Sequence, residues 1–66
     1  MNLVIDFTDS AQYSVEELES FEDISEITFI VPVFIFLQNN FSHIFRYVEF
    51  LSRRPLIRTS VKPVVN

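Results

Sequence analysis

Residues 27–37 read Ile-Thr-Phe-Ile-Val-Pro-Val-Phe-Ile-Phe-Leu, and the architecture of the chain depends most on them. Apart from Thr28 the stretch is apolar, and six of its eleven residues are β-branched. β-branched side chains favour a strand. Pro32 opposes a place in the centre of a sheet, because proline cannot donate a hydrogen bond to the ladder. The stretch therefore predicts a strand with an edge position, a bulge or a break at Pro32.

The same stretch has a second interpretation, in which Pro32 lies in the first turn of one long helix over residues 32–54. Apolar residues then recur at alternating spacings of three and four over nearly three heptads. They are Phe34, Leu37, Phe41, Ile44, Val48 and Leu51. The β-branched and aromatic content opposes such a helix. A mainly α fold is therefore the alternative.

The sequence after the apolar stretch predicts a helix and then a strand. Residues 40–54 have the one-face spacing of an amphipathic helix, which ends before Pro55. The apolar face would consist of Phe41, Ile44, Phe45, Val48 and Leu51. Residues 56–65 alternate in polarity and predict a short edge strand, because Pro63 limits pairing.

The sequence before the apolar stretch predicts a strand and a helix. Residues 2–8 alternate, with Leu3, Ile5 and Phe7 on one face. Asp9-Ser10 follow with turn chemistry. Ser14-Val15-Glu16-Glu17 matches a capping box, which predicts a helix that begins after Ser14. The later acids are unfavourable near a helix C-terminus, so we expect this helix to end around residue 23 or 24.

Together these segments predict a small α+β fold with the order strand-helix-strand-helix-strand. Residues 1–66 would form one domain. Its core would come from residues 27–37 packed against the apolar face between Phe41 and Leu51. The chain has no glycine, so tight β-hairpins are disfavoured and connections through helices are favoured.

Composition excludes several classes of chemistry. Glycine-dependent phosphate loops, dinucleotide fingerprints and nucleophile elbows require a residue that this chain lacks. The absence of cysteine excludes disulfides, thiolate zinc sites and cysteine nucleophiles. The one histidine, His43, has no acid or nucleophile at a suitable spacing. The sequence therefore predicts a protein that is not an enzyme, with no catalytic residue and no cofactor.

Charge is strongly segregated along the chain. Residues 1–26 contain eight acids and no base, whereas residues 27–66 contain five bases and one acid. One interpretation is internal neutralisation between the two halves. The other is an acidic docking face for the basic surface of another protein. The candidate partner-binding acids are Glu16, Glu17, Glu19, Glu22, Asp23 and Glu26, and the basic tail consists of Arg53, Arg54, Arg58 and Lys62.

Two other ligands for these charges are disfavoured. Glu19, Glu22, Asp23 and Glu26 would share one helical face if the helix continued, but a solvated acidic face accounts for them without a metal. No metal site is therefore predicted. The basic tail is too thin for nucleic acid, and the acidic half would repel phosphates.

These observations favour a non-enzymatic protein-interaction module in the cytoplasm, such as a small regulator, inhibitor or accessory subunit. It would dock a partner through its acidic N-terminal half and an aromatic-rich surface, since the chain has eight phenylalanines. The alternative is a membrane-associated subunit anchored through residues 27–51, with a cytoplasmic basic tail. Only the first eleven residues of that segment are cleanly apolar, and Gln38-Asn39-Asn40 interrupt it. Homo-oligomerisation is left open by the sequence.

Overall fold

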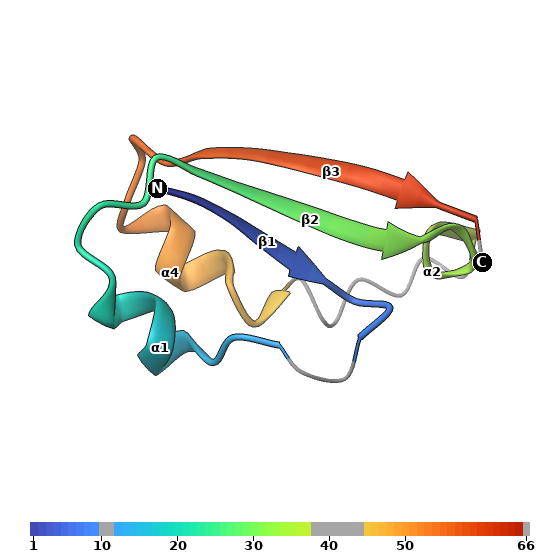
Figure 1. Ribbon diagram of the computed structural model, residues 1–66, viewed down its shortest axis with the longest axis horizontal. Helices are drawn as coiled ribbons and strands as arrows, with labels where there is room; N and C mark the ends of the chain where they lie inside the picture. Colours follow the sequence, from blue (N-terminus) through green and yellow to red (C-terminus); the bar gives the residue numbers. More distant parts are fainter. Residues whose placement is uncertain (10–11, 38–44, 66) are drawn as a thin grey trace.

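A three-stranded parallel sheet organises the chain (Figure 1). The computed structural model describes residues 1–9, 12–37 and 45–65. In chain order the elements are β1 (Asn2–Asp6), α1 (Val15–Ser20), β2 (Glu26–Pro32), α2 (Val33–Leu37), α4 (Val48–Ser52) and β3 (Arg58–Val64). The predicted mixture of helices and strands is confirmed. The parallel arrangement was not part of the prediction.

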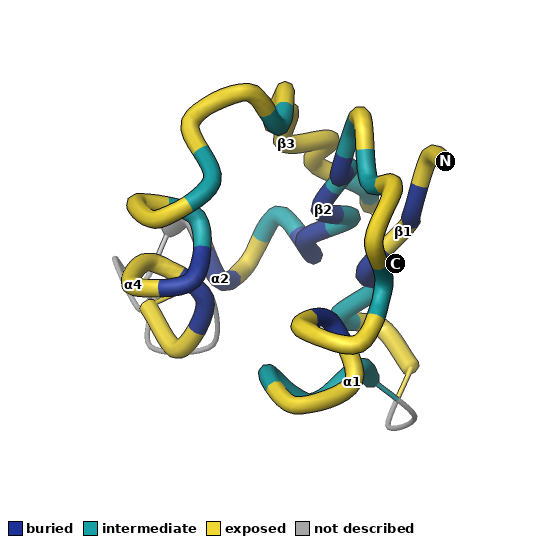
Figure 2. The backbone as a smooth tube through the Cα atoms, turned by 90° about the vertical axis from the view of Figure 1, so that its left-hand side faces the viewer, coloured by how far each residue is buried: buried dark blue, intermediate teal, exposed yellow. Residues whose placement is uncertain are grey.

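The strands lie in the order β1-β2-β3, with Leu3 opposite Ile27 and Ile27 opposite Thr59. Parallel neighbours require crossover connections, and helices supply them here. Both views place α1 and α4 on the same side of the sheet (Figures 1 and 2). One face of the sheet is therefore covered by helices and the other is open.

The core lies between the sheet and these helices. Its buried side chains are Leu3, Ile5, Leu18, Ile27, Phe29, Val31, Ile35, Tyr47 and Phe50. The Phe29 ring lies 6.0 Å from Phe7 and 5.8 Å from Tyr47, measured between centroids. Every second residue of β2 thus points into the core, which confirms the predicted contribution of this stretch at Ile27, Phe29 and Val31. Ile35 of α2 is also buried, whereas Phe34 is exposed.

The other predicted half of the core is wrong at Phe45 and Val48 and partly right at Leu51. Phe45 is 66% exposed and Val48 is 50% exposed, whereas Tyr47 is fully buried and Phe50 is 2% exposed. Leu51 is partly buried, and the predicted positions 41 and 44 lie outside the described residues. α4 begins only at Val48 and spans five residues, so it presents a different face to the sheet than a helix over residues 40–54 would.

A single helix over residues 32–54 is also wrong. Pro32 belongs to β2, and residues 46–47 form a turn immediately before α4. β2 is the central strand and ends at Pro32, so of the three predicted alternatives the break applies and the edge position does not. The proline is tolerated because it is the last residue of β2, whereas β1 has already ended at Asp6, opposite Ile30. No partner strand on that side needs the missing N–H.

The first helix begins as predicted and ends early. The Glu17 amide donates to the Ser14 hydroxyl at 3.1 Å, and the Ser14 amide donates to the Glu17 carboxylate at 3.1 Å, which completes the capping box. α1 ends at Ser20, and Phe21 turns to extended backbone. The Phe21 ring packs edge-on against Tyr13, so an aromatic contact replaces the expected last turn of helix.

The turn after β1 uses the side chain of Asp6, and the predicted turn residue Ser10 lies outside the described residues. The Asp6 carboxylate accepts from the Thr8 hydroxyl at 2.6 Å and from the Thr8 amide at 2.8 Å. The Asp9 amide donates to the Asp6 carbonyl oxygen at 3.2 Å. This turn ends β1 two residues earlier than the alternation predicted.

β3 is an edge strand, as Pro63 predicted, and is exposed over almost all of its length (Figure 2). Its register places Arg58, Ser60 and Lys62 opposite Glu26, Thr28 and Ile30, on the open face of the sheet. The hydroxyl groups of Thr28 and Ser60 lie 3.2 Å apart across this pair of strands. Among the described residues, no helix is long and apolar enough to cross a membrane.

Candidate functional site

The six candidate acids do not share one helical face. Glu16, Glu17 and Glu19 lie on α1, and the remaining three lie in the following loop and at the start of β2. All are exposed except Glu26, which is half-buried. Alignment of Glu19 with the later acids on one face would require the helix to continue beyond residue 20. Because α1 ends at Ser20, these acids do not share a helical face.

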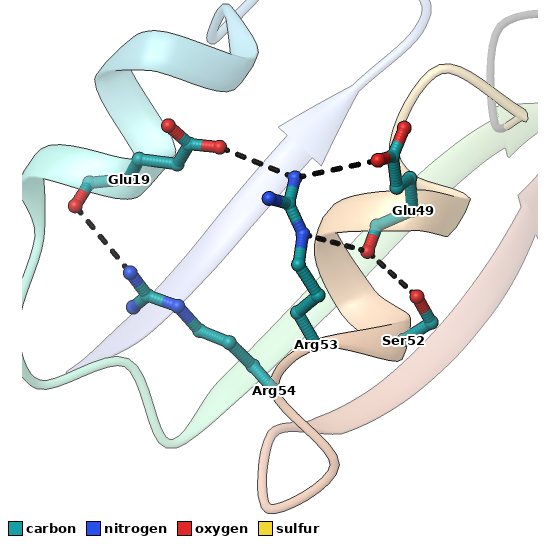
Figure 3. Close-up of polar contacts among 5 residues, drawn as sticks. All are labelled: Glu19, Glu49, Ser52, Arg53 and Arg54. Carbon is teal, nitrogen blue, oxygen red and sulfur yellow. Dashed lines mark hydrogen bonds and ion pairs between the residues drawn. The ribbon is translucent and has the colours of Figure 1, made fainter.

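Part of the charge is neutralised internally by Arg53. Its guanidinium lies 3.5 Å from the Glu19 carboxylate and 4.0 Å from the Glu49 carboxylate (Figure 3). The side chains of Arg53 and Glu19 are 60% and 47% exposed. Exposed ion pairs of this kind contribute about 0.2–1 kcal/mol. The contact therefore compensates charge between the halves of the chain but adds little to stability.

Arg54 makes a more specific contact with the end of α1. Its guanidinium donates to the Phe21 carbonyl oxygen at 3.1 Å and to the Glu19 carbonyl oxygen at 3.4 Å (Figure 3 shows the second). It also lies 4.9 Å from the centroid of the Phe50 ring. A cation at the C-terminal end of a helix satisfies carbonyl groups that have no partner within the helix. Arg54 is thus a structural residue.

The basic tail does not form one surface. Arg53 and Arg54 follow α4 on the covered side, near α1, whereas Arg58 and Lys62 lie on the open face of the sheet. All but Arg54 are exposed, and Arg54 is half-buried. From the two predicted sets, the structure brings Glu19 together with Arg53 and Arg54, and the register of β2 and β3 places Glu26 opposite Arg58.

Several of the candidate acids, among them Glu16 and Glu22, have no compensating group among the described residues. Within the part of the chain that the structure describes, the side chains of Glu16 and Glu22 make no hydrogen bond or ion pair. Both are exposed, at the first turn of α1 and in the loop after it. These positions leave net negative charge on the surface of the N-terminal half.

The described residues contain no group of three metal-ligating side chains. His43 lies outside them. The pKa of Asp6 is lowered from its ordinary value, chiefly by the hydrogen bond from the Thr8 hydroxyl and then by that from the Thr8 amide. Both groups that lower it belong to Thr8, in the turn after β1.

A groove that the sequence reasoning missed runs beside β1. Its volume is about 340 Å³, and it is lined by Val4, Asp6, Asp9, Gln12, Tyr13 and Glu17. We call it the β1 groove. Val4 and Asp6 belong to β1, Gln12 and Tyr13 precede α1, and Glu17 lies on α1. Only knowledge of the sheet order, in which β1 is an edge strand, would have brought these residues together.

A second hollow, of about 270 Å³, is lined by Glu19, Phe50, Arg53 and Arg54. Its polar groups are those already engaged with each other and with the end of α1. It therefore belongs to the contact between α1 and α4.

Comparison with known proteins finds no family model, no curated protein and no solved structure that matches the chain.

Proposed function

We propose that the protein is a non-enzymatic interaction module that docks the basic surface of another protein through its acidic N-terminal half. A small cytoplasmic regulator, inhibitor or accessory subunit would act in this way. The observation that carries the proposal is the charge of Glu16 and Glu22, which no described residue compensates. The arginines on the covered side of the sheet, Arg53 and Arg54, already bind Glu19 and backbone carbonyl groups.

Internal neutralisation is the competing explanation for the segregated charge, and it applies to only part of it. Arg53 compensates Glu19, and Arg54 is committed to backbone carbonyl groups. Arg58 and Lys62 lie across the sheet from α1. Charge that folding leaves unpaired on a surface steers association with a partner of opposite sign. The exposed acids around α1 have that arrangement.

A basic probe with low β-propensity, which is disfavoured from adding to a sheet, tests this proposal. We would use an alanine–lysine peptide of about 16 residues, whose composition favours a helix, and a matched alanine–glutamate peptide. We expect the lysine peptide alone to bind, and its affinity to fall as the salt concentration rises.

The double variant Glu16→Lys/Glu22→Lys should weaken binding of the lysine peptide at low salt. Glu49→Lys is the control, because Glu49 lies on α4 and is outside the candidate set. Binding that is insensitive both to salt and to the double charge reversal would overturn the proposed docking surface.

A further inference from the structure

The two edges of the sheet differ in how well they are protected against further pairing. An exposed strand edge presents unpaired N–H and C=O groups, and proteins commonly block it with proline or lysine. β3 contains both, as Lys62 and Pro63. β1, Asn2–Asp6, contains neither.

The backbone hydrogen bonds show which groups face each edge. The Arg58 amide donates to the Ser25 carbonyl oxygen at 3.0 Å, so the backbone groups of Arg58 face β2. The backbone groups of residues at odd-numbered distances from Arg58 along β3 therefore face outward. Pro63 is one of the outward residues, because it is five positions from Arg58. The edge of β3 therefore lacks an N–H donor there.

On the other side, the Phe7 amide donates to the Ile30 carbonyl oxygen at 2.9 Å, and the Glu26 amide donates to the Met1 carbonyl oxygen at 3.5 Å. Met1 and Phe7 thus face β2. By the same alternation, the backbone groups of Asn2, Val4 and Asp6 face the open edge.

The β1 groove adjoins this edge and gives it a charge preference. Asp6, Asp9 and Glu17 place carboxylates around it, and Val4 and Tyr13 supply apolar surface. Val4 is 52% exposed. Hydrogen bonds from Thr8 to Asp6 and from Ser14 to Glu17 hold two of the carboxylates in place.

We propose that the β1 edge and the β1 groove bind an extended, lysine- or arginine-rich segment of a partner protein, which adds to the sheet as a fourth strand. Backbone hydrogen bonds at Asn2 and Val4 would give affinity, and the carboxylates would select basic side chains, as in other cases of strand addition. The inference rests on the proposed function, because it specifies the partner's chemistry and the place at which it binds.

The probe is an octapeptide of alternating lysine and valine, compared with a glutamate–valine octapeptide. A third peptide repeats the lysine–valine sequence with N-methyl groups on two consecutive central residues, which block both of its edges but keep its charge. We expect only the first peptide to bind well. N-methylation should weaken binding by about tenfold, which corresponds to the loss of one or two hydrogen bonds.

Two readouts on the protein locate the site. The Val4 amide should gain protection from hydrogen exchange when the lysine–valine peptide binds. Asp6→Asn should weaken binding several-fold, because the amide oxygen can still accept from Thr8 but the charge is lost. Glu49→Gln, the same kind of change on α4, should leave binding unchanged.

The outcomes separate this inference from the function on which it rests. Equal binding of the N-methylated peptide, or an unprotected Val4 amide in the complex, would overturn strand addition. If the helical lysine peptide still binds with dependence on Glu16 and Glu22, the acidic docking surface stands without the groove. Strand addition with no effect of Asp6→Asn or of salt would overturn the selection of basic side chains.

Discussion

The Tyr47 hydroxyl donates a hydrogen bond of 2.6 Å to the Tyr13 carbonyl oxygen, across 34 positions of sequence. Tyr47 is fully buried, and its ring packs against Phe29 of β2. Tyr13 immediately precedes the capping box of α1. One side chain therefore joins the central strand, the turn before α4 and the entrance to α1.

We expect Tyr47→Phe to lower the free energy of unfolding by about 1–2 kcal/mol. The ring and its packing are kept, but the Tyr13 carbonyl loses its donor in a partly buried place. Urea-induced unfolding, followed by circular dichroism, measures the difference.

Tyr13→Phe is the matched control. It removes a hydroxyl that makes no hydrogen bond with the described residues and keeps the backbone carbonyl. Its stability should equal that of the unchanged chain within about 0.5 kcal/mol. Equal losses of stability in the two variants would show that the hydrogen bond from Tyr47 contributes no more to the free energy of unfolding than the Tyr13 hydroxyl does.

The parts of the fold that the sequence predicted correctly are those determined by neighbouring residues. The capping box depends on Ser14 and Glu17, which are three positions apart, and it forms as expected. The β2 strand follows from a run of β-branched residues. Pro63 indicates an edge strand because it has no backbone N–H to donate to a neighbouring strand. Each of these features depends on short-range geometry, which sequence patterns report well.

The buried face of α4 could not be predicted in detail, because it depends on tertiary contacts with the sheet. Periodicity selects Phe45 and Val48 for the core, but the sheet receives Tyr47 and Phe50. A helix of five residues makes little more than one turn, so a change in its start rotates the buried face completely. The candidate site was missed for a related reason, since the β1 groove exists only once β1 is known to be an edge strand.

The difference between Phe50 and Phe45 gives a direct test of the observed register. Phe50→Ala should cost about 3–5 kcal/mol, because it removes a buried ring and leaves a cavity. A chain of this length has about 3–10 kcal/mol of stability in total, so Phe50→Leu is the milder variant for a measurable transition. Phe45→Ala should cost less than about 0.5 kcal/mol, because that ring is exposed.

Thermal unfolding of the three variants distinguishes the two helical faces. A large loss of stability in Phe45→Ala, with little effect in Phe50→Leu, would contradict the structure. It would favour the helical face predicted from the sequence periodicity, which contains Phe45 and Val48. Far-ultraviolet circular dichroism at low temperature shows whether Phe50→Ala folds at all.

Arg54 and Arg53 should differ in importance although they are adjacent. Arg54→Ala should lower stability by about 1–2 kcal/mol, since it removes two hydrogen bonds to carbonyl groups at the end of α1 and a cation–π contact with Phe50. Arg53→Ala removes exposed ion pairs and should cost less than about 1 kcal/mol.

Arg54→Lys refines this comparison. Lysine keeps the charge but cannot reach two carbonyl oxygens with one planar group, so an intermediate loss is expected. Urea unfolding at low and high salt provides the measurement. Equal losses of stability in Arg53→Ala and Arg54→Ala, both abolished by salt, would contradict this. They would mean that Arg54 stabilises the fold through its charge alone and not through its hydrogen bonds to the carbonyl groups.

The turn after β1 should make the free energy of unfolding depend on pH in the acidic range. The Thr8 hydroxyl, and then the Thr8 amide, lower the pKa of Asp6 below its ordinary value of 3.8. The ionised carboxylate is favoured in the folded state, so its contribution is fully present above the unfolded pKa. It is lost as the pH falls through the lower, folded pKa. The charged form of Asp6 therefore helps to hold the end of β1 at neutral pH.

Thr8→Val tests this, because it removes the hydroxyl donor and keeps the amide donor at 2.8 Å. The pKa of Asp6 should rise toward 3.8, as measured from the ¹³C chemical shift of the carboxyl carbon between about pH 2 and pH 6. Asp6→Asn should flatten the acid limb of the stability profile, because the amide does not titrate. An unchanged Asp6 pKa in Thr8→Val would mean that the hydroxyl does not hold the carboxylate, and that the turn depends on the backbone alone.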